Sequence, residues 1–242
     1  MAFNKHRRKQ PHLPRPRCGA VVPAAGQATR MAGQDKVLYE LNGVPLIIHT
    51  LLALDKCPDI NDIVVVARPD DIVLLGGLCR QYDITKIRQV VCGGPTRTHS
   101  VLNGLMALSL ETELAAIHDA ARPLVSPQLI SNTILLAAQT GAAAPAVRPK
   151  DTVKKISGTQ VESTVPRDTV RLIQTPQVFN AGLIKGALVR AIRENWEITD
   201  DCSAVERMGM SVSLTEGSYE NFKVTTPEDL IFAEALMERK QV

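Results

Sequence analysis

The first residues that could do chemistry are Arg30 and Lys36, two cations that follow a loop of small residues in GAVVPAAGQATRMAGQDK, residues 19–36. The loop opens with Ala24, Ala25 and Gly26. Small residues let a ligand approach backbone N–H groups, and fixed cations beside them suit phosphate oxygens. The segment has neither the GxGxxG of dinucleotide sites nor the GKS or GKT ending of a P-loop. It therefore indicates either a nucleoside triphosphate site of another kind or an ordinary surface loop with solvated cations.

A second polar loop reads GGPTRTHS and contains Gly93, Gly94, Arg97 and Ser100. Paired glycines let the edge of a base approach the backbone, whose N–H and C=O groups can recognise its donors and acceptors. The same pair is also typical of a simple turn between a strand and a helix. On its own the loop does not decide between the two interpretations.

A third loop, IHDAARP, ends an apolar run in Asp119, with Arg122 close behind. An unpaired carboxylate is costly to bury at the end of such a run. A Mg²⁺ ion or a substrate hydroxyl would explain Asp119, and one carboxylate is enough for magnesium in phosphate chemistry. The alternative is that Asp119 caps a following helix. We interpret His118 as a packed side chain and assign it no role.

Two segments near the C-terminus are also polar. In ENFKVTTPEDL we expect Lys223 in a short strand, before a helix capped by Thr226 with Pro227 at its first position. This lysine either extends along the surface or faces the site. In ITDDCSA, Asp200 and Asp201 could ligate a metal, but the start of a capped helix is the favoured interpretation.

These residues need a scaffold, and the hydrophobic pattern indicates one. Predicted strands at 19–24, 62–67, 87–92 and 114–119 alternate with predicted helices at 45–56, 69–83 and 100–109. The strands are apolar on both faces, which is typical of a parallel sheet covered by helices on each side. We therefore predict a doubly wound α/β fold with a mostly parallel, Rossmann-like sheet. Ligands of such sheets bind outside the carboxyl ends of the strands, where the polar loops would meet.

The pattern changes after a predicted helix at 126–141, which has Ser126 as its N-cap and Gly141 at its end. Two β-prone runs, 151–156 and 160–165, flank a short turn and predict a protruding β-hairpin arm at about 148–170. A two-stranded hairpin with so little apolar surface is marginally stable alone. We expect it to lie on its own domain or on a second subunit, which favours a homodimer. The α/β pattern then resumes, with helices predicted near 181–195, after Thr199 and at 227–240.

Composition limits the function classes. The formal charge of +3 hides six basic residues before Cys18, so the rest of the chain carries −3. We predict a disordered basic arm at 1–17 and a single domain at 18–242, and we favour a solvated arm over a nucleic-acid or membrane anchor.

The aromatic content of 3% argues against a nucleic-acid stacking surface. No stretch of about 20 apolar residues predicts a membrane helix, and five scattered cysteines without a CxxC pair predict buried or half-buried thiols in a cytoplasmic protein.

Together these motifs resemble one family, the 2-C-methyl-D-erythritol 4-phosphate cytidylyltransferases of the non-mevalonate isoprenoid pathway. The resemblance runs from about Cys18 to Lys240. It rests on VVPAAG with Arg30 and Lys36, GG with its following arginine and serine, HDAARP, DTVK, TVPR, TPQVF, ITDDCSA and KVTTPEDL. Eight motifs in the family's order are a specific signal, although each one alone would be weak.

The resemblance implies a transferase that uses CTP and Mg²⁺. The phosphate of methylerythritol phosphate would attack the α-phosphorus of CTP and expel pyrophosphate. Arg30, Lys36 and Lys223 would stabilise the charge that develops in the transition state. This fits the chemistry, because nucleotidyl transfer needs positioning and electrostatics more than a covalent nucleophile. The implied CTP-binding residues are Ala24, Ala25, Gly26, Gly93, Gly94 and Ser100.

The resemblance also implies residues that bind the acceptor. Asp119, Arg122 and Thr175 would face methylerythritol phosphate, with Asp119 also near the hydrated metal. Thr152 and Arg167 lie in the predicted hairpin, which in this family reaches across a homodimer into the partner's site. Each site would then be built from two chains.

The chain departs from the family in a few places. Ala28 replaces a usual glycine, and Pro95 replaces a usual acidic residue and removes one backbone N–H donor. Asp35, Lys36 and Val37 stand where Pro-Lys-Gln is common.

Two alternatives remain open. A ribitol 5-phosphate cytidylyltransferase would share the fold and the cations, but it resembles this chain less at VVPAAG and at DAARP. A catalytically silent nucleotide-binding protein, tethered to nucleic acid by the basic arm, belongs to another class. The intact charged residues argue against it.

Overall fold

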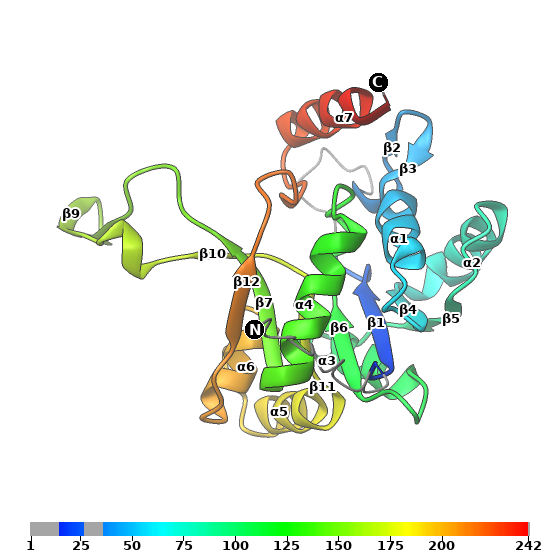
Figure 1. The fold of residues 1–242 in the computed structure, drawn as a ribbon, viewed down its shortest axis with the longest axis horizontal. Helices are drawn as coiled ribbons and strands as arrows, with labels where there is room; N and C mark the ends of the chain where they lie inside the picture. Colours follow the sequence, from blue (N-terminus) through cyan, green and yellow to red (C-terminus); the bar gives the residue numbers. More distant parts are fainter. Residues whose placement is uncertain (1–14, 27–35, 242) are drawn as a thin grey trace, which may run out of the picture.

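The computed structural model describes residues 15–26 and 36–241. Its centre is an eight-stranded sheet in the order β10-β7-β11-β6-β1-β4-β5, with β12 also paired to β7 (Figure 1). The strands are β1 (Cys18–Pro23), β4 (Asp62–Ala67), β5 (Ile87–Cys92), β6 (Leu114–Ile117), β7 (Ala142–Val147), β10 (Leu172–Ile173), β11 (Gln177–Asn180) and β12 (Ser213–Glu216). Strands β6, β1, β4 and β5 run parallel, whereas β11 lies antiparallel between β6 and β7.

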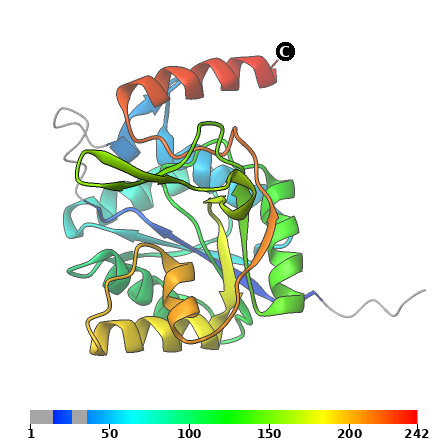
Figure 2. The ribbon, with the colours of Figure 1, turned by 90° about the vertical axis from the view of Figure 1, so that its left-hand side faces the viewer.

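Helices cover both faces of the sheet, which confirms the predicted doubly wound fold. One face carries α1 (Leu46–Lys56), α2 (Ile72–Gln81) and α4 (Pro127–Thr140), and the other carries α3 (Arg97–Ala107), α5 (Ala181–Arg193) and α6 (Asp201–Arg207). Figure 2 shows α4 and α5 on opposite sides of the strands. Side chains alternate along β1, so Ala20 and Val22 enter one core and Val21 enters the other.

Local signals fix the ends of several helices. The Ser126 hydroxyl accepts the N–H of Leu129 at the start of α4, and Gly141 ends that helix at φ = 84°, a left-handed conformation that favours glycine. Both features are as predicted. A short 3₁₀ turn, η2 (Pro69–Asp71), leads into α2.

Gly104 brings α3 close to the sheet. A Cβ at this position would lie 2.4 Å from Cγ1 of Val21 and 2.8 Å from Cγ2 of Val66, so only glycine fits without a shift. The close approach sets the N-terminal end of α3 beside the carboxyl ends of β1 and β4. That end carries part of the predicted site.

The C-terminal helix forms a small third core with the segment after β1. Helix α7 (Pro227–Gln241) packs Leu230, Ala233 and Met237 against Leu41 of β2 (Glu40–Leu41) and Leu46, the first residue of α1. The strand β3 (Val44–Pro45) pairs with β2, and the 3₁₀ turn η1 (Lys36–Leu38) precedes them. This cluster ties the segment of Lys36 to the segment that leads into α7.

The short strand predicted around Lys223 is wrong. Lys223 lies in an irregular loop, where Val224 donates its N–H to the carbonyl of Ala121 at 2.8 Å and no ladder of strand pairs follows. The predicted start of α7 is correct, because Pro227 is its first residue and Thr226 accepts the N–H of Asp229.

The predicted hairpin is present and stands away from the sheet (Figure 1). Its strands are β8 (Lys154–Ser157) and β9 (Gln160–Thr164), followed by the 3₁₀ turn η3 (Arg167–Thr169). Every residue of both strands is exposed, including Ile156 at 64% and Val161 at 61%. The hairpin therefore buries none of its strands on the described part of its own chain.

Most of the predicted basic arm, residues 1–14, lies outside the described residues. Arg15 forms an ion pair with Asp59, and the backbone of Arg17 bonds to Glu113. Cys92 is exposed, which contradicts its predicted burial, whereas the other four cysteines are buried, and all five are free thiols. Within residues 15–26 and 36–241, no helix combines the length and the apolar character needed to cross a membrane.

Candidate active site

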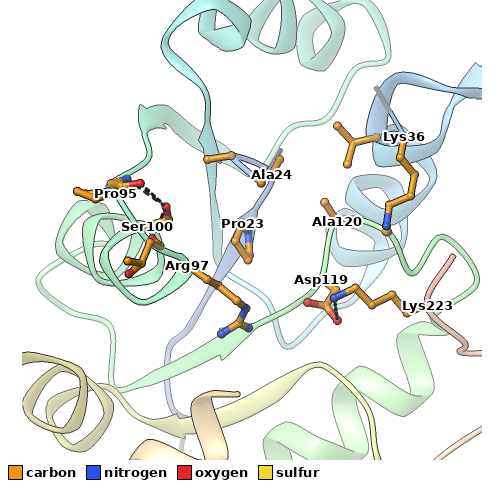
Figure 3. Close-up of a pocket in the computed structure, with 15 residues that line it drawn as sticks. Pro23, Ala24, Lys36, Pro95, Arg97, Ser100, Asp119, Ala120 and Lys223 are labelled. Carbon is orange, nitrogen blue, oxygen red and sulfur yellow. Dashed lines mark hydrogen bonds and ion pairs between the residues drawn. The ribbon is translucent and has the colours of Figure 1, made fainter. Parts of the chain in front are cut away.

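A cavity of about 600 Å³ opens at the carboxyl ends of the parallel strands (Figure 3). It lies where the loops after β1, β5 and β6 meet, as the doubly wound topology predicts. Among the described residues its lining is Pro23, Ala24, Ala25, Gly26, Lys36, Val37, Gly94, Pro95, Thr96, Arg97, Ser100, Asp119, Ala120, Ala121 and Lys223. The charged residues of this lining are Lys36, Lys223, Arg97 and Asp119.

The loop after β1 forms one wall. Ala24 donates its N–H to the carbonyl of Val66 at 2.7 Å, which fixes the first turn of the loop against β4. Lys36 extends from η1 into the same space (Figure 3). Arg30, which was predicted as the third catalytic cation, lies outside the described residues.

The glycine loop after β5 forms the adjacent wall. Gly94 donates its N–H to Oγ of Ser100 at 3.0 Å, so Ser100 holds the loop onto the first turn of α3. Gly93 is outside the lining. A Cβ on Gly93 would lie 2.5 Å from Cβ of Ala25, so this glycine allows the two loops to touch. Pro95 has no N–H and that of Gly94 is engaged with Ser100, so neither residue offers a ligand a free backbone donor.

Asp119 lies between cations on the third side of the cavity. Its Oδ2 is 3.3 Å from Nζ of Lys223 and 3.2 Å from Nε of Arg122. Burial opposes ionisation of Asp119, but Lys223, Arg122 and Arg97 outweigh that cost and lower its pKa to about 2. The two ion pairs account for the buried carboxylate. The helix-cap alternative is wrong, because the next helix begins only at Pro127.

Arg122 and Thr175 lie behind Asp119 and are not among the cavity's lining residues. The Thr175 hydroxyl accepts the N–H of Asp119 at 3.1 Å and contacts Nδ1 of His118 at 3.1 Å. Arg122 also donates to the carbonyl of Asn221 at 2.7 Å. His118 is fully buried, and burial lowers its pKa to about 4, so its ring is neutral at pH 7. The geometry places Arg122 and Thr175 where they fix Asp119.

An ion pair that the sequence analysis missed joins α3 to α6. Arg97 donates from Nη1 and Nη2 to the two carboxylate oxygens of Asp201, at 3.0 and 2.6 Å. Burial raises the pKa of the Asp201 carboxyl, and the Arg97 guanidinium acts against that rise. Asp200 caps α6 by accepting the N–H of Ser203 at 2.9 Å, which confirms the favoured interpretation of ITDD. The described residues hold no cluster of three or more metal-binding side chains.

The two predicted hairpin residues do not reach this cavity. Thr152 and Arg167 are exposed on the arm, and neither is among the lining residues. The described cavity is therefore formed by the loops of the sheet and by the segment before α7 alone.

Comparison with known proteins identifies the family. The family model for 2-C-methyl-D-erythritol 4-phosphate cytidylyltransferase, IspD, matches residues 18–239. The chain belongs to this family. An enzyme of that name from Halalkalibacterium halodurans is 45% identical over 91% of this chain and 97% of its own length. One from Geobacillus thermodenitrificans is 46% identical over 90% of this chain and 96% of its own length.

Solved structures agree with this assignment. The 4-diphosphocytidyl-2C-methyl-D-erythritol synthase of Anaerococcus prevotii has a TM-score of 0.83 and 34% identity, covering 92% of this chain and 96% of its own. The 2-C-methyl-D-erythritol 4-phosphate cytidylyltransferase of Thermus thermophilus has a TM-score of 0.73 and 33% identity, covering 90% and 98%. These structures thus confirm the doubly wound α/β fold predicted from the sequence and identify it as that of a nucleotidyltransferase.

Proposed function

We propose that this enzyme transfers the cytidylyl group of CTP to 2-C-methyl-D-erythritol 4-phosphate, giving 4-diphosphocytidyl-2-C-methyl-D-erythritol and pyrophosphate. Membership of the cytidylyltransferase family over residues 18–239 is the observation that carries the proposal. The cavity supports it, because two lysines and an arginine line a space at the carboxyl ends of the strands where a triphosphate can bind.

The reaction needs no covalent nucleophile from the protein. A phosphate oxygen of the acceptor attacks the α-phosphorus of CTP, and the bond to the bridging oxygen of the β-phosphate breaks as pyrophosphate leaves. Negative charge develops on the leaving oxygen and around the α-phosphorus. Lys36 and Lys223 both line the cavity, which supports a role in stabilising that charge, with Arg30 as the third predicted cation.

The two walls of the cavity suit the two halves of CTP. Ala24, Ala25 and Gly26 would cradle the phosphates beside Lys36. The loop of Gly93 and Gly94 would take the base, because backbone carbonyls accept the amino group of cytosine and reject the carbonyl of uracil. Ser100, which holds that loop, would bind near the ribose.

Magnesium fits the site through Asp119. The carboxylate lines the cavity and is ionised at neutral pH, and Lys223 and Arg122 both bind its Oδ2. Oδ1 of Asp119 thus remains for the ion or its waters, and the phosphates of CTP would supply the other ligands. When bound, Mg²⁺ would offset the charge of the triphosphate.

We also infer a homodimer in which the hairpin of one chain completes the cavity of the other. The exposed strands, with Ile156 and Val161 on the surface, support this, since a hairpin without a covering surface is marginally stable. Thr152 and Arg167 would then contact methylerythritol phosphate in the partner's site. A cytoplasmic location stays a prediction from the scattered free cysteines.

Release of pyrophosphate from CTP and Mg²⁺ tests the reaction. The purified protein is assayed with methylerythritol 4-phosphate, with ribitol 5-phosphate and without an acceptor. We expect release with the first acceptor only. Release with ribitol phosphate alone would replace the acceptor but keep the mechanism, and no release with either acceptor would overturn the proposal.

A further inference from the structure

The ion pair of Arg97 and Asp201 connects the cavity to a helix that does not line it. Arg97 is the first residue of α3 and lines the cavity, whereas Asp201 begins α6 and is fully buried. The Arg97 guanidinium donates one hydrogen bond to each carboxylate oxygen of Asp201, at 3.0 and 2.6 Å. A bidentate pair of this kind fixes the plane of the guanidinium as well as its position.

Asp201 is held in place independently of Arg97. Oε1 of Gln177, on β11, accepts the N–H groups of both Asp201 and Cys202 at 3.0 Å. Nε2 of Gln177 donates to Oδ2 of Asp200 at 2.7 Å. Because the sheet anchors the backbone at the start of α6 in this way, the buried Asp201 side chain extends from a fixed backbone position towards Arg97.

Stability alone does not account for the pair. A buried ion pair often contributes no more than well-packed apolar residues of the same volume. Arg97, however, keeps 37% of its side chain exposed. Two of its five N–H groups serve Asp201, and no described residue accepts a hydrogen bond from the other three. In Figure 3 the side chain extends towards the side of the cavity that holds Asp119 and Lys223.

We propose that Asp201 is a positioning residue that holds the Arg97 guanidinium so that its remaining N–H groups bind substrate phosphate oxygens in the cavity. A planar fork of donors with a fixed orientation suits phosphate better than a mobile cation does. The inference rests on the proposed function for its substrate. Both CTP and the acceptor carry phosphate, and the kinetic test separates the two sources.

The test is a double-mutant cycle with Asp201→Asn, Arg97→Ala and both changes together. We expect Asp201→Asn to lower kcat/KM about 10-fold or more, because a displaced binding group loses its geometry. In the Arg97→Ala background the same change should cost nothing further, since the group that it positions is gone. A raised KM for CTP assigns the contact to the triphosphate, and a raised KM for methylerythritol phosphate assigns it to the acceptor.

Asp59→Asn is the matched control. Asp59 is also a buried carboxylate paired with an arginine, but it lies beside the amino end of β1. It should leave kcat and both KM values unchanged. Urea unfolding of each variant separates loss of fold from loss of orientation.

A second variant covers the case in which Asp201→Asn does not fold. Arg97→Lys keeps a cation beside Asp201 but removes the fork, and it should raise the Kd for CTP or the KM for the acceptor. Binding of CTP is also followed by calorimetry, so the inference is tested even if the acceptor is another polyol phosphate. Wild-type constants in Arg97→Lys would overturn it, as would an equal cost of Asp201→Asn with and without Arg97.

Discussion

Lys36 and Lys223 come from opposite ends of the chain and line one cavity, because the core beneath α7 ties their segments together. If they stabilise the transition state, Lys36→Ala and Lys223→Ala should each lower kcat by about 10²–10³. The rate of pyrophosphate release at saturating substrates measures this. Lys56→Ala, at the exposed end of α1 and away from the cavity, is the control and should change nothing. Near-wild-type turnover in either cavity variant would contradict its role.

Asp119 should make stability depend on pH. Its pKa is about 2 in the folded protein, below the usual value of 3.8, so its ion pairs stabilise the fold above about pH 4. This contribution, about 2 kcal/mol, is lost as the pH falls through the folded pKa. Wild type should therefore exceed Asp119→Asn in free energy of unfolding at pH 7, and the difference should shrink steadily between pH 4 and pH 2.

Urea unfolding of both proteins at several pH values measures the difference. A gap that stays constant down to pH 2 would show that the ion pairs of Asp119 do not lower its pKa. A gap that grows as the pH falls would show that folding raises the pKa of Asp119 instead of lowering it.

At the scale of elements, the position of α3 decides the shape of the cavity, because its first turn carries Arg97 and Ser100. Gly104→Ala would place a Cβ 2.4 Å from Val21 and push the helix off the sheet. We expect a loss of about 1–3 kcal/mol of stability, with a higher KM for CTP. Gly186→Ala in α5 has no atom within 4 Å of the new Cβ and should instead stabilise the fold by up to about 1 kcal/mol.

Urea unfolding and the KM for CTP together check the Gly104 argument. A stable Gly104→Ala enzyme with an unchanged KM would show that α3 does not need its close approach to β1. Destabilisation of Gly186→Ala by the same amount would point to a general cost of changing helical glycines.

The elements of the parallel half were predictable because each carries its own signal. The run of apolar residues in β4 has no polar face, so it had to be covered on both sides. Ser126 and Gly141 mark the ends of α4 with local hydrogen bonds and backbone geometry. The loop of Lys223 resembles a strand in sequence, because apolar Phe222 and Val224 flank the charged Lys223. In the structure both apolar side chains pack against α7, and the backbone of this loop pairs with no strand.

The site was only partly predictable, because side-chain pairing depends on tertiary contacts. The loops with Lys36, Ser100, Asp119 and Lys223 meet as the topology requires. The partner of Arg97 lies 104 residues further along the chain, on a helix whose position only the packed core determines. Whether a loop residue such as Arg122 faces the cavity or supports Asp119 also depends on that packing, and no local pattern reports it.

At the scale of the molecule, the hairpin and the cavity are separate in one chain. All residues of β8 and β9 are exposed, and neither Thr152 nor Arg167 lines the cavity. In a closed dimer with twofold symmetry, two such arms would each meet the partner's cavity. In the proposed dimer, one chain supplies the cavity residues of a site and the partner supplies its hairpin residues. Mixed dimers of two variants can test this.

Two inactive variants should restore activity when they share a dimer. Arg167→Ala removes a hairpin residue and Lys36→Ala removes a cavity residue, so one site of the mixed dimer combines an intact cavity with an intact hairpin. Random pairing of co-expressed chains should return about a quarter of wild-type activity. Mixing Lys36→Ala with Lys223→Ala is the control, since both changes lie in the cavity and every site stays defective. If Arg167 instead acted within its own chain, the first mixture would stay as inactive as the second.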